Sequence, residues 1–426
     1  MSKKTVLTGI TTSGTPHIGN YLGAIKPAIE ASENSDNESF FFLADYHALI
    51  KCHDPQRVAQ SSREIAATWL AMGLDTDKAT FYRQSDIPEI PELTWILTCM
   101  TSKGLMNRSH AYKASVDANQ EAGKAELDDG ITMGLFSYPM LMAADILMFN
   151  ADIVPVGKDQ IQHIEMTRDI AGRFNSTYKK LFNLPDAQVD EETQLIPGLD
   201  GRKMSKSYDN TLPLFSEPDD LYKLIKQIDT DSKLPGEAKD PDSSTVFQLY
   251  NCFANQDEAA YMRDQFANGI AWGDAKKELF EFLDAKLATP REEYKRLMLD
   301  LPFVESVLLK GAEKARKISA PFMDEVRIAA GIRPLPFVDT QQAVIVKKEK
   351  SAEALDRAAQ GKRRGILMQL KKVLETVANS DDQAAAAELL IADKTAALST
   401  MKGKSKDKAE NELSVLQEEL AQYLAP

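Results

Sequence analysis

Between residues 5 and 174, this chain alternates short apolar runs with longer stretches of helical periodicity. The apolar runs at 5–8, 39–44, 80–82 and 153–156 predict four strands. Helical stretches begin near residue 18, at the N-cap pair Asp54-Pro55, and at about residues 89, 137 and 159. This alternation predicts an α/β fold with a parallel sheet and helices on both faces. Because ligands of such sheets bind at the carboxyl ends of the strands, we look for site residues there.

The pattern changes twice further along the chain. From about residue 217 to 332 it is helical with charged faces, until Arg333-Pro-Leu-Pro336 interrupts it. Residues 351–426 have the pattern of two or three amphipathic helices, separated near Ser380 and near residues 402–406. We therefore expect an α/β domain at 1–216, a helical domain at 217–333 and a helical C-terminal extension of unknown role at 334–426. The polar stretch 115–130 is predicted to be a surface insertion in the first domain.

The composition excludes several classes of protein. The three cysteines, Cys52, Cys99 and Cys252, are far apart, which argues against a disulfide framework or a zinc ribbon. The five histidines lack metal-ligand spacing, so we predict no protein-bound metal. The first residues lack an apolar signal core, and no stretch approaches the roughly 18 apolar residues of a membrane span. A cytoplasmic protein without membrane contact is expected.

The net charge of −13 is unevenly distributed. Residues 345–426 contain 14 Lys and Arg against 13 Asp and Glu, a net charge of +1, whereas residues 1–344 contain 37 against 51, a net charge of −14. Phosphate contacts come from Lys and Arg, so any RNA-binding surface must be a local basic patch.

Two polar segments carry the strongest functional signal. Gly201-Arg-Lys-Met-Ser-Lys-Ser207, the lysine loop, holds two lysines three residues apart. Thr11-Thr-Ser-Gly-Thr-Pro-His-Ile-Gly-Asn20, the start segment, lies where the first strand turns into a helix. Gly19 permits close backbone approach to adenine or ribose, and His17 and Asn20 can hydrogen-bond phosphate oxygens. Backbone N–H groups and two loop ammonium groups can neutralise a triphosphate from two sides, which indicates an ATP-consuming site.

Two further segments contain candidate ligand contacts. One is a predicted helix, and the other lies at the end of a predicted strand. The helix Tyr138-Pro-Met-Leu-Met-Ala-Ala-Asp-Ile-Leu-Met148 has one carboxylate, Asp145, in its apolar middle. A buried Asp is costly unless it is paired or hydrogen-bonded, so this residue has either a structural partner or a ligand. Gly157 ends the fourth strand, and Asp159 and Gln160 open the next helix. His47 follows the second strand, where it is either structural or part of the site.

Together, these segments resemble the class I aminoacyl-tRNA synthetases, and residues 4–333 are similar to the tryptophanyl-tRNA synthetase family. Asn20 stands where many class I enzymes carry a second histidine, as in the tryptophan family. His17 departs from that family, many of whose members carry Thr at this position.

The resemblance implies a Rossmann-like nucleotide-binding domain and a tryptophan--tRNA ligase. Such an enzyme activates L-tryptophan with ATP to tryptophanyl-adenylate and pyrophosphate, and then transfers the amino acid to tRNA(Trp). Mg²⁺ arrives with ATP. A cytoplasmic homodimer is implied as well.

The family's roles can be carried over residue by residue. The resemblance implies Lys203, Lys206, Ser205, His17 and Asn20 as catalytic residues. It implies ATP contacts from Thr11, Thr12, Ser13, Gly19, Asn20, Lys113, Gly157, Lys158, Asp159, Ile196, Lys203, Met204, Ser205, Lys206 and Ser207. It implies tryptophan contacts from Asp145, which accepts the indole N–H, and from Met142, Tyr138, Gln160 and His47.

Three alternatives remain open at this point. A tyrosyl-tRNA synthetase needs a tyrosine and an aspartate around the phenol hydroxyl, whereas this helix presents Met142 and Asp145. A non-catalytic paralogue would not need both lysines of the loop. A small-molecule adenylyl transferase such as pantothenate synthetase would not need the helical domain.

Overall fold

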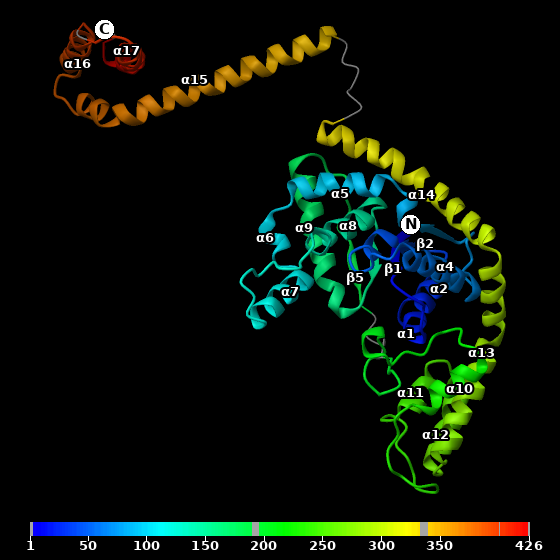
Figure 1. Ribbon diagram of the computed structural model, residues 1–426. Coiled ribbons are helices and arrows are strands. Elements are labelled where there is room, and N and C mark those ends of the chain that lie inside the picture. Colours follow the sequence, from blue (N-terminus) through cyan, green and yellow to red (C-terminus); the bar gives the residue numbers. More distant parts are fainter. Residues whose placement is uncertain (1–2, 190–195, 333–339, 400, 425–426) are drawn as a thin grey trace. The chain divides into compact units, whose positions relative to one another are not determined.

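The computed structural model describes residues 3–189, 196–332, 340–399 and 401–424. The chain forms two compact units, Met1–Leu335 and Pro336–Pro426 (Figure 1). The domain boundary expected at residues 333–334 lies outside the described residues, and the finer boundary expected at residue 217 stays a prediction.

The first unit contains a five-stranded parallel sheet. Its strands are β1 (Lys4–Thr11), β2 (Asn37–Ala44), β3 (Ala79–Arg83), β4 (Ile153–Pro155) and β5 (Asp186–Gln188), in the order β3-β2-β1-β4-β5. The four expected strands and the α/β fold class are confirmed. The strand β5 was missed because its sequence, Asp-Ala-Gln, has no apolar run. It is a strand because it pairs with β4 at the edge of the sheet.

The helices up to residue 177 largely follow the sequence pattern. They are α1 (Ile18–Asn20), α2 (Lys26–Ser32), α3 (Asp45–Ala48), α4 (Pro55–Ala71), α5 (Glu89–Met100), α6 (Lys103–Met106), α7 (His110–Glu121), α8 (Met133–Met148) and α9 (Ile161–Thr177). The predicted N-cap Asp54 accepts hydrogen bonds from two backbone N–H groups of α4. In the polar stretch 115–130, residues 115–121 continue α7, which begins at His110. The expectation that this stretch is a surface insertion stays a prediction.

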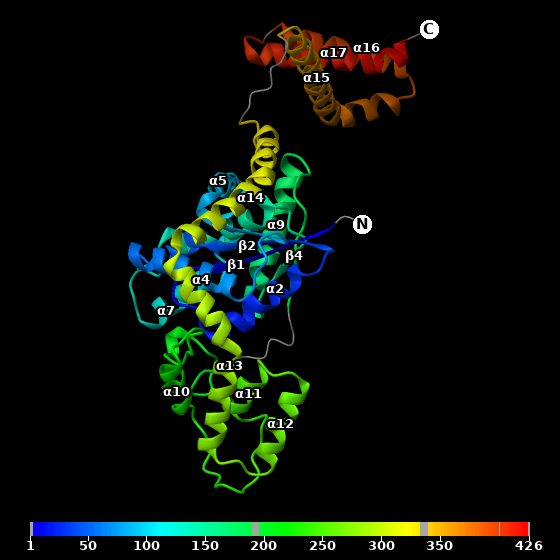
Figure 2. The same cartoon turned by 90° about the vertical axis from the view of Figure 1, so that its right-hand side faces the viewer.

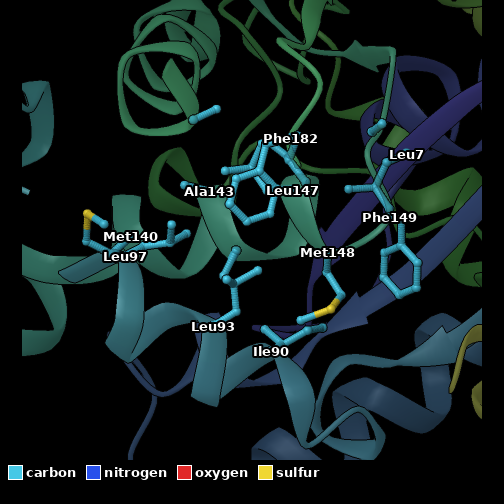
Figure 3. Close-up of a cluster of buried hydrophobic side chains, with 14 of the residues drawn as sticks. Leu7, Ile90, Leu93, Leu97, Met140, Ala143, Leu147, Met148, Phe149 and Phe182 are labelled. Atoms are coloured by element: carbon cyan, nitrogen blue, oxygen red, sulfur yellow. The ribbon is translucent and has the colours of Figure 1, made fainter. Parts of the chain in front are cut away.

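Alternating side chains of the strands build a core on each face of the sheet. In β2, Phe40 and Phe42 pack with α5 and α8, whereas Phe41 and Leu43 pack with α2 and α4. Figure 3 shows the first of these clusters, in which Leu93 of α5 and Leu147 of α8 lie near one another. Both faces are therefore covered, and the strand ends are left to form a site.

A long helix protects the β3 edge of the sheet. The helix α14 (Leu301–Ala330) continues after α13 (Trp272–Leu299), as Figure 2 shows, and it packs against β3. Its Gly311 is buried against the backbone carbonyl of Phe81. Arg316 and Arg327 of α14 reach Glu89 and Glu92 of α5 at 2.8 and 2.5 Å. An unpaired strand edge is thereby covered.

The helices α10 (Pro218–Lys226), α11 (Thr245–Asn251) and α12 (Gln256–Ala267) pack with α13 around a second core. Ile18 and Leu22 from the start of the chain and Met204 from the lysine loop belong to the same core. The lysine loop is therefore anchored by apolar packing against the start of the chain and against the helices α10–α13.

The second unit is a helical bundle of α15 (Thr340–Ala378), α16 (Gln383–Leu398) and α17 (Lys404–Leu424). Its described core contains Leu370, Val377, Ala387, Leu416 and Leu420. The helix breaks predicted near Ser380 and near residues 402–406 are confirmed. Of the helices in the described parts of both units, none has the length and apolarity to cross a membrane.

The close approach of α14 to β3 gives a stability prediction. In Gly311→Ala, the new Cβ would overlap the Phe81 carbonyl, which cannot move freely because β3 is paired with β2. We expect the free energy of unfolding to fall by about 1–3 kcal/mol, measured by urea denaturation. Gly172→Ala on α9 is the matched control, because no atom lies within 4 Å of its new Cβ. Equal stability of the two variants would contradict this packing.

Candidate active site

The backbone joins the start segment to the chain that follows the lysine loop. The Ile18 N–H donates to the Leu212 carbonyl at 2.9 Å, and the Leu214 N–H donates to the Pro16 carbonyl at 3.2 Å. Two segments almost 200 residues apart in sequence therefore form one surface at the carboxyl end of β1.

Backbone hydrogen bonds join the lysine loop to the residues that precede it, 196–198. The Met204 N–H donates to the Ile196 carbonyl at 2.9 Å, and the Gly198 N–H donates to the Arg202 carbonyl at 2.7 Å. Met204 is buried in the second core, and Ile196 packs against that core. Because these apolar side chains hold the loop down, the flanking Lys203 side chain remains exposed.

Asn210 cross-links this loop and was not predicted as a functional residue. Its amide donates to Asp200 Oδ1 at 2.7 Å and to the Lys203 carbonyl at 3.1 Å. Its oxygen accepts the Ser205 N–H at 2.8 Å. The Asn210 hydrogen bond is the main reason that the pKa of Asp200 is lowered. Burial is the feature that distinguishes Asn210. The burial of a single asparagine cannot be predicted from the residues next to it in the sequence.

The hydroxyl groups of the loop serine residues are close together. Ser205 Oγ and Ser207 Oγ lie 2.8 Å apart, and Ser205 Oγ also accepts the Ser207 N–H at 3.3 Å. Both hydroxyls therefore shape the turn that carries Lys206.

His17 and Asn20 form the entry to the first helix. Asn20 Oδ1 accepts the His17 backbone N–H at 3.1 Å, so this side chain is engaged in a cap. Burial, and secondly the charge of Lys206, lower the pKa of His17 to about 4, which leaves the imidazole neutral at pH 7. A Cβ at Gly19 would lie 3.1 Å from the His17 ring, so glycine allows the ring to fold back there. Of the neighbouring threonine and serine residues, Thr12 is buried and Thr11 and Ser13 are exposed.

The Lys206 ammonium group approaches the start segment at Gly14. A Cβ built on Gly14 would lie 2.5 Å from Lys206 Nζ and 3.1 Å from Nη2 of Arg57. The Lys206 side chain is exposed as a whole, but its tip is drawn in against the backbone. Partial burial of that tip, and then the nearby Arg57, lower the pKa of Lys206.

Asp145 is the centre of a second cluster, at the carboxyl ends of β2 and β3. Its side chain is 1% exposed. Gln84 donates to both carboxylate oxygens at 2.8 and 2.9 Å, and His47 Nε2 lies 3.0 Å from Oδ2. Burial raises the pKa of Asp145, while the bonds from His47 and Gln84 oppose this shift. Sequence reasoning missed Gln84, because a glutamine after a short strand carries no distinctive pattern.

Aromatic rings line the same cluster. Tyr138 lies edge-on to His47 with ring centroids 6.4 Å apart, and its hydroxyl is 2.5 Å from His163 Nε2. Met142 lies one turn before Asp145 on α8 and is half-buried against the first core. The structure thus brings Asp145, Tyr138 and His47 together.

Several predicted ATP contacts lie outside these two clusters. Lys113 is an exposed residue on α7, and Gly157 and Lys158 are exposed at the end of β4. Gln160 is half-buried at the start of α9. The side chain of Asp159 lies outside the described residues. No hydrogen bond or ion pair joins Lys113 to the lysine loop within the described chain, so its role stays a prediction.

Comparison with known proteins identifies the family. The model of class I tRNA synthetases for tryptophan and tyrosine (W and Y) matches residues 2–288. A tryptophan--tRNA ligase of Pseudomonas putida is 58% identical over 352 residues, which cover 82% of this chain and 78% of that protein. This chain belongs to the class I tryptophanyl-tRNA synthetases. The family predicted from the sequence is confirmed.

Two further matches show how the chain relates to that family. The tryptophan--tRNA ligase of Neisseria meningitidis is 57% identical over 335 residues, which are 79% of this chain and 100% of that protein. A crystal structure of the Campylobacter jejuni tryptophanyl-tRNA synthetase, complexed with ADP and tryptophan, is 40% identical with a TM-score of 0.70. It covers 77% of this chain and 99% of that one. The chain therefore contains sequence beyond a complete family member.

The contact at Gly14 gives a prediction for the site. In Gly14→Ala, the new methyl group would displace the flexible tip of Lys206 without touching the sheet. Because small displacements of a positioned group are costly, we expect kcat for amino-acid-dependent ATP–pyrophosphate exchange to fall about tenfold to a hundredfold. The melting temperature should change little. A variant with wild-type kcat would show that the position of Lys206 against Gly14 does not matter for the reaction.

Proposed function

We propose that this chain activates L-tryptophan with Mg²⁺-ATP and transfers it to tRNA(Trp), acting in the cytoplasm as a homodimer. The observation that carries the proposal is the buried Asp145 carboxylate at the carboxyl ends of β2 and β3. The chain that holds it is 57–60% identical to tryptophan--tRNA ligases. The steps below assign the roles of individual residues on this basis.

The geometry of Asp145 supports indole recognition. A carboxylate has about four acceptor positions. Gln84 and His47 occupy three of them, and Oδ1 receives only the bond from Gln84. One acceptor position therefore remains for the indole N–H, which is a donor without any acceptor of its own. Met142 and Tyr138 supply the apolar and aromatic surface for the ring, and Gln160 is assigned to the amino group of the substrate.

The arrangement of cations supports adenylate formation. An oxygen of the tryptophan carboxylate attacks the α-phosphorus of ATP, a new C–O–P linkage forms, and the bond to the pyrophosphate leaving group breaks. Lys203 and Lys206 stabilise the negative charge that develops on the phosphates. Neutral His17 and the backbone around Gly19 hold the nucleotide. No proton needs to move in this step, because the attacking carboxylate is ionised.

The homodimer is supported by an exposed aromatic residue on the first unit. Trp95 on α5 is 69% exposed although it is flanked by buried positions of the core. Large aromatic side chains are enriched at protein interfaces. Sedimentation analysis of the full chain tests the dimer directly.

The assay for the proposed function is ATP–pyrophosphate exchange with each of the twenty amino acids. Tryptophan alone should drive efficient exchange. Efficient exchange with tyrosine would indicate a tyrosyl-tRNA synthetase instead. Exchange with none of the amino acids would indicate a non-catalytic relative.

The variant Asp145→Ala tests the tryptophan pocket. It removes the acceptor for the indole N–H and leaves Gln84 and His47 without their partner. We expect kcat/KM for tryptophan to fall. The loss should correspond to about 2–4 kcal/mol of transition-state stabilisation. Thermal unfolding serves as the control for folding. Wild-type kinetics would contradict the assignment of this pocket.

Truncation after about residue 336 tests the second unit. A complete relative matches only 79% of this chain, so the catalytic reaction does not require an added unit in that protein. We expect tryptophan-dependent exchange within about threefold of the full-length rate. Residues 345–426 contain basic clusters at Lys347-Lys348, Lys362-Arg-Arg364, Lys371-Lys372 and 402–408. If these clusters contact tRNA phosphates, charging of tRNA(Trp) will weaken more steeply with salt in the full-length protein than in the truncated one. Loss of exchange in a folded, dimeric truncated protein would mean that the second unit completes the active site.

A further inference from the structure

Two cations from distant parts of the chain approach one point of the start segment. Lys206 Nζ comes from the lysine loop, and Arg57 Nη2 comes from the first turn of α4. Both lie within 3.1 Å of the position that a Cβ would occupy at Gly14. Arg57 Nη2 also donates a long hydrogen bond, 3.5 Å, to Thr15 Oγ1. The guanidinium group is therefore held over the start segment, close to the loop ammonium group.

The positive charge at this point is only partly offset by the protein. Neither Arg57 nor Lys206 forms a salt bridge within the described residues, and the first turn of α4 contains no acidic residue. Glu64, two turns further along α4, accepts a hydrogen bond from Gln60 at 3.0 Å. Its charge acts to raise the pKa of Lys206, in opposition to burial and to Arg57. The N-cap carboxylate of Asp54 offsets part of the positive end of the helix dipole, but the two cations still favour binding of an anion.

We propose that Arg57 binds the β- and γ-phosphates of ATP, and the pyrophosphate that leaves, together with Lys206. This assignment rests on the proposed function and adds a residue to it. Arg57 belongs to a seventeen-residue helix that packs against the sheet. Its guanidinium group is therefore a fixed partner for phosphate oxygens, whereas Lys206 is carried by a loop.

The proposal explains why two like charges face each other. Without a triphosphate, Arg57 and Lys206 repel each other, and the pKa of Lys206 is lowered partly for this reason. A bound phosphate group reverses the sign of the interaction and draws both cations inward. No atom of Arg57 changes its bonding in the reaction, because the residue binds the leaving group only through charge and N–H donation.

The test compares three variants of the full-length protein. Arg57→Ala removes the guanidinium group, and Arg57→Lys retains the charge without the planar fork. Arg63→Ala is the matched control, because this exposed arginine lies on the same helix near Glu305 of α14. The readouts are kcat, the KM for ATP and the KM for pyrophosphate in exchange at saturating tryptophan, with circular dichroism to confirm folding.

We expect Arg57→Ala to raise the KM for pyrophosphate by about tenfold or more and to lower kcat/KM for ATP by a similar factor. Arg57→Lys should recover part of both losses, and Arg63→Ala should change neither. The KM for tryptophan should stay constant in all three variants. A purely structural role for Arg57 would affect folding or all substrates alike.

A second measurement separates ATP from tRNA as the source of the phosphate. Wild-type and variant proteins are loaded with tryptophanyl-adenylate, and a single turnover of transfer to tRNA(Trp) is followed. We expect Arg57→Ala to transfer at the wild-type rate, because no pyrophosphate is then present. A defect confined to this transfer step would overturn the proposal in favour of a tRNA phosphate.

Failure of the inference is distinguishable from failure of the proposed function. If wild-type protein catalyses tryptophan-dependent exchange and Arg57→Ala keeps the wild-type KM values for ATP and pyrophosphate, Arg57 does not bind phosphate. If wild-type protein shows no tryptophan-dependent exchange, the proposed function itself is wrong, and the proposal for Arg57 falls with it.

Discussion

The site depends on the backbone pairing between residues 16–18 and 212–214. These hydrogen bonds connect the end of β1 to the chain that leaves the lysine loop. Met204 reinforces the connection because it is buried with Ile18 in the same core. The backbone pairing and the apolar core thus join the lysine loop to the start segment at the end of β1.

The two ends of the site have opposite electrostatic characters. At the start segment, Lys206 and Arg57 supply positive charge that Glu64 offsets only in part. At the ends of β2 and β3, the buried Asp145 supplies negative charge that Gln84 and His47 only partly satisfy. This distribution of charge suits two substrates. One is polyanionic and binds at the positive end, and the other offers a ring N–H donor to the carboxylate. Each end carries the cost of its unmatched charge until the complementary ligand binds.

The second unit lies outside residues 2–288, which the family model matches. A relative matched over its whole length corresponds to 79% of this chain, and α15–α17 have a hydrophobic core of their own. Their basic clusters are interrupted by acidic partners, since Arg363 pairs with Glu418 and Glu419. Such pairing leaves fewer cations available for RNA than the sequence alone indicates.

The sequence by itself determined the fold class, four of the strands and the family, because apolar periodicity and the two polar segments are local patterns. It also indicated Asp145, since a lone carboxylate in an apolar helix must have a partner. Only the tertiary structure decided what that partner is, and it revealed Gln84, Asn210 and Arg57. These three polar residues have ordinary neighbours in sequence. Asn210 matters because it is buried and bonded within its own loop, whereas Gln84 and Arg57 matter because distant chain segments bring charged groups close to them.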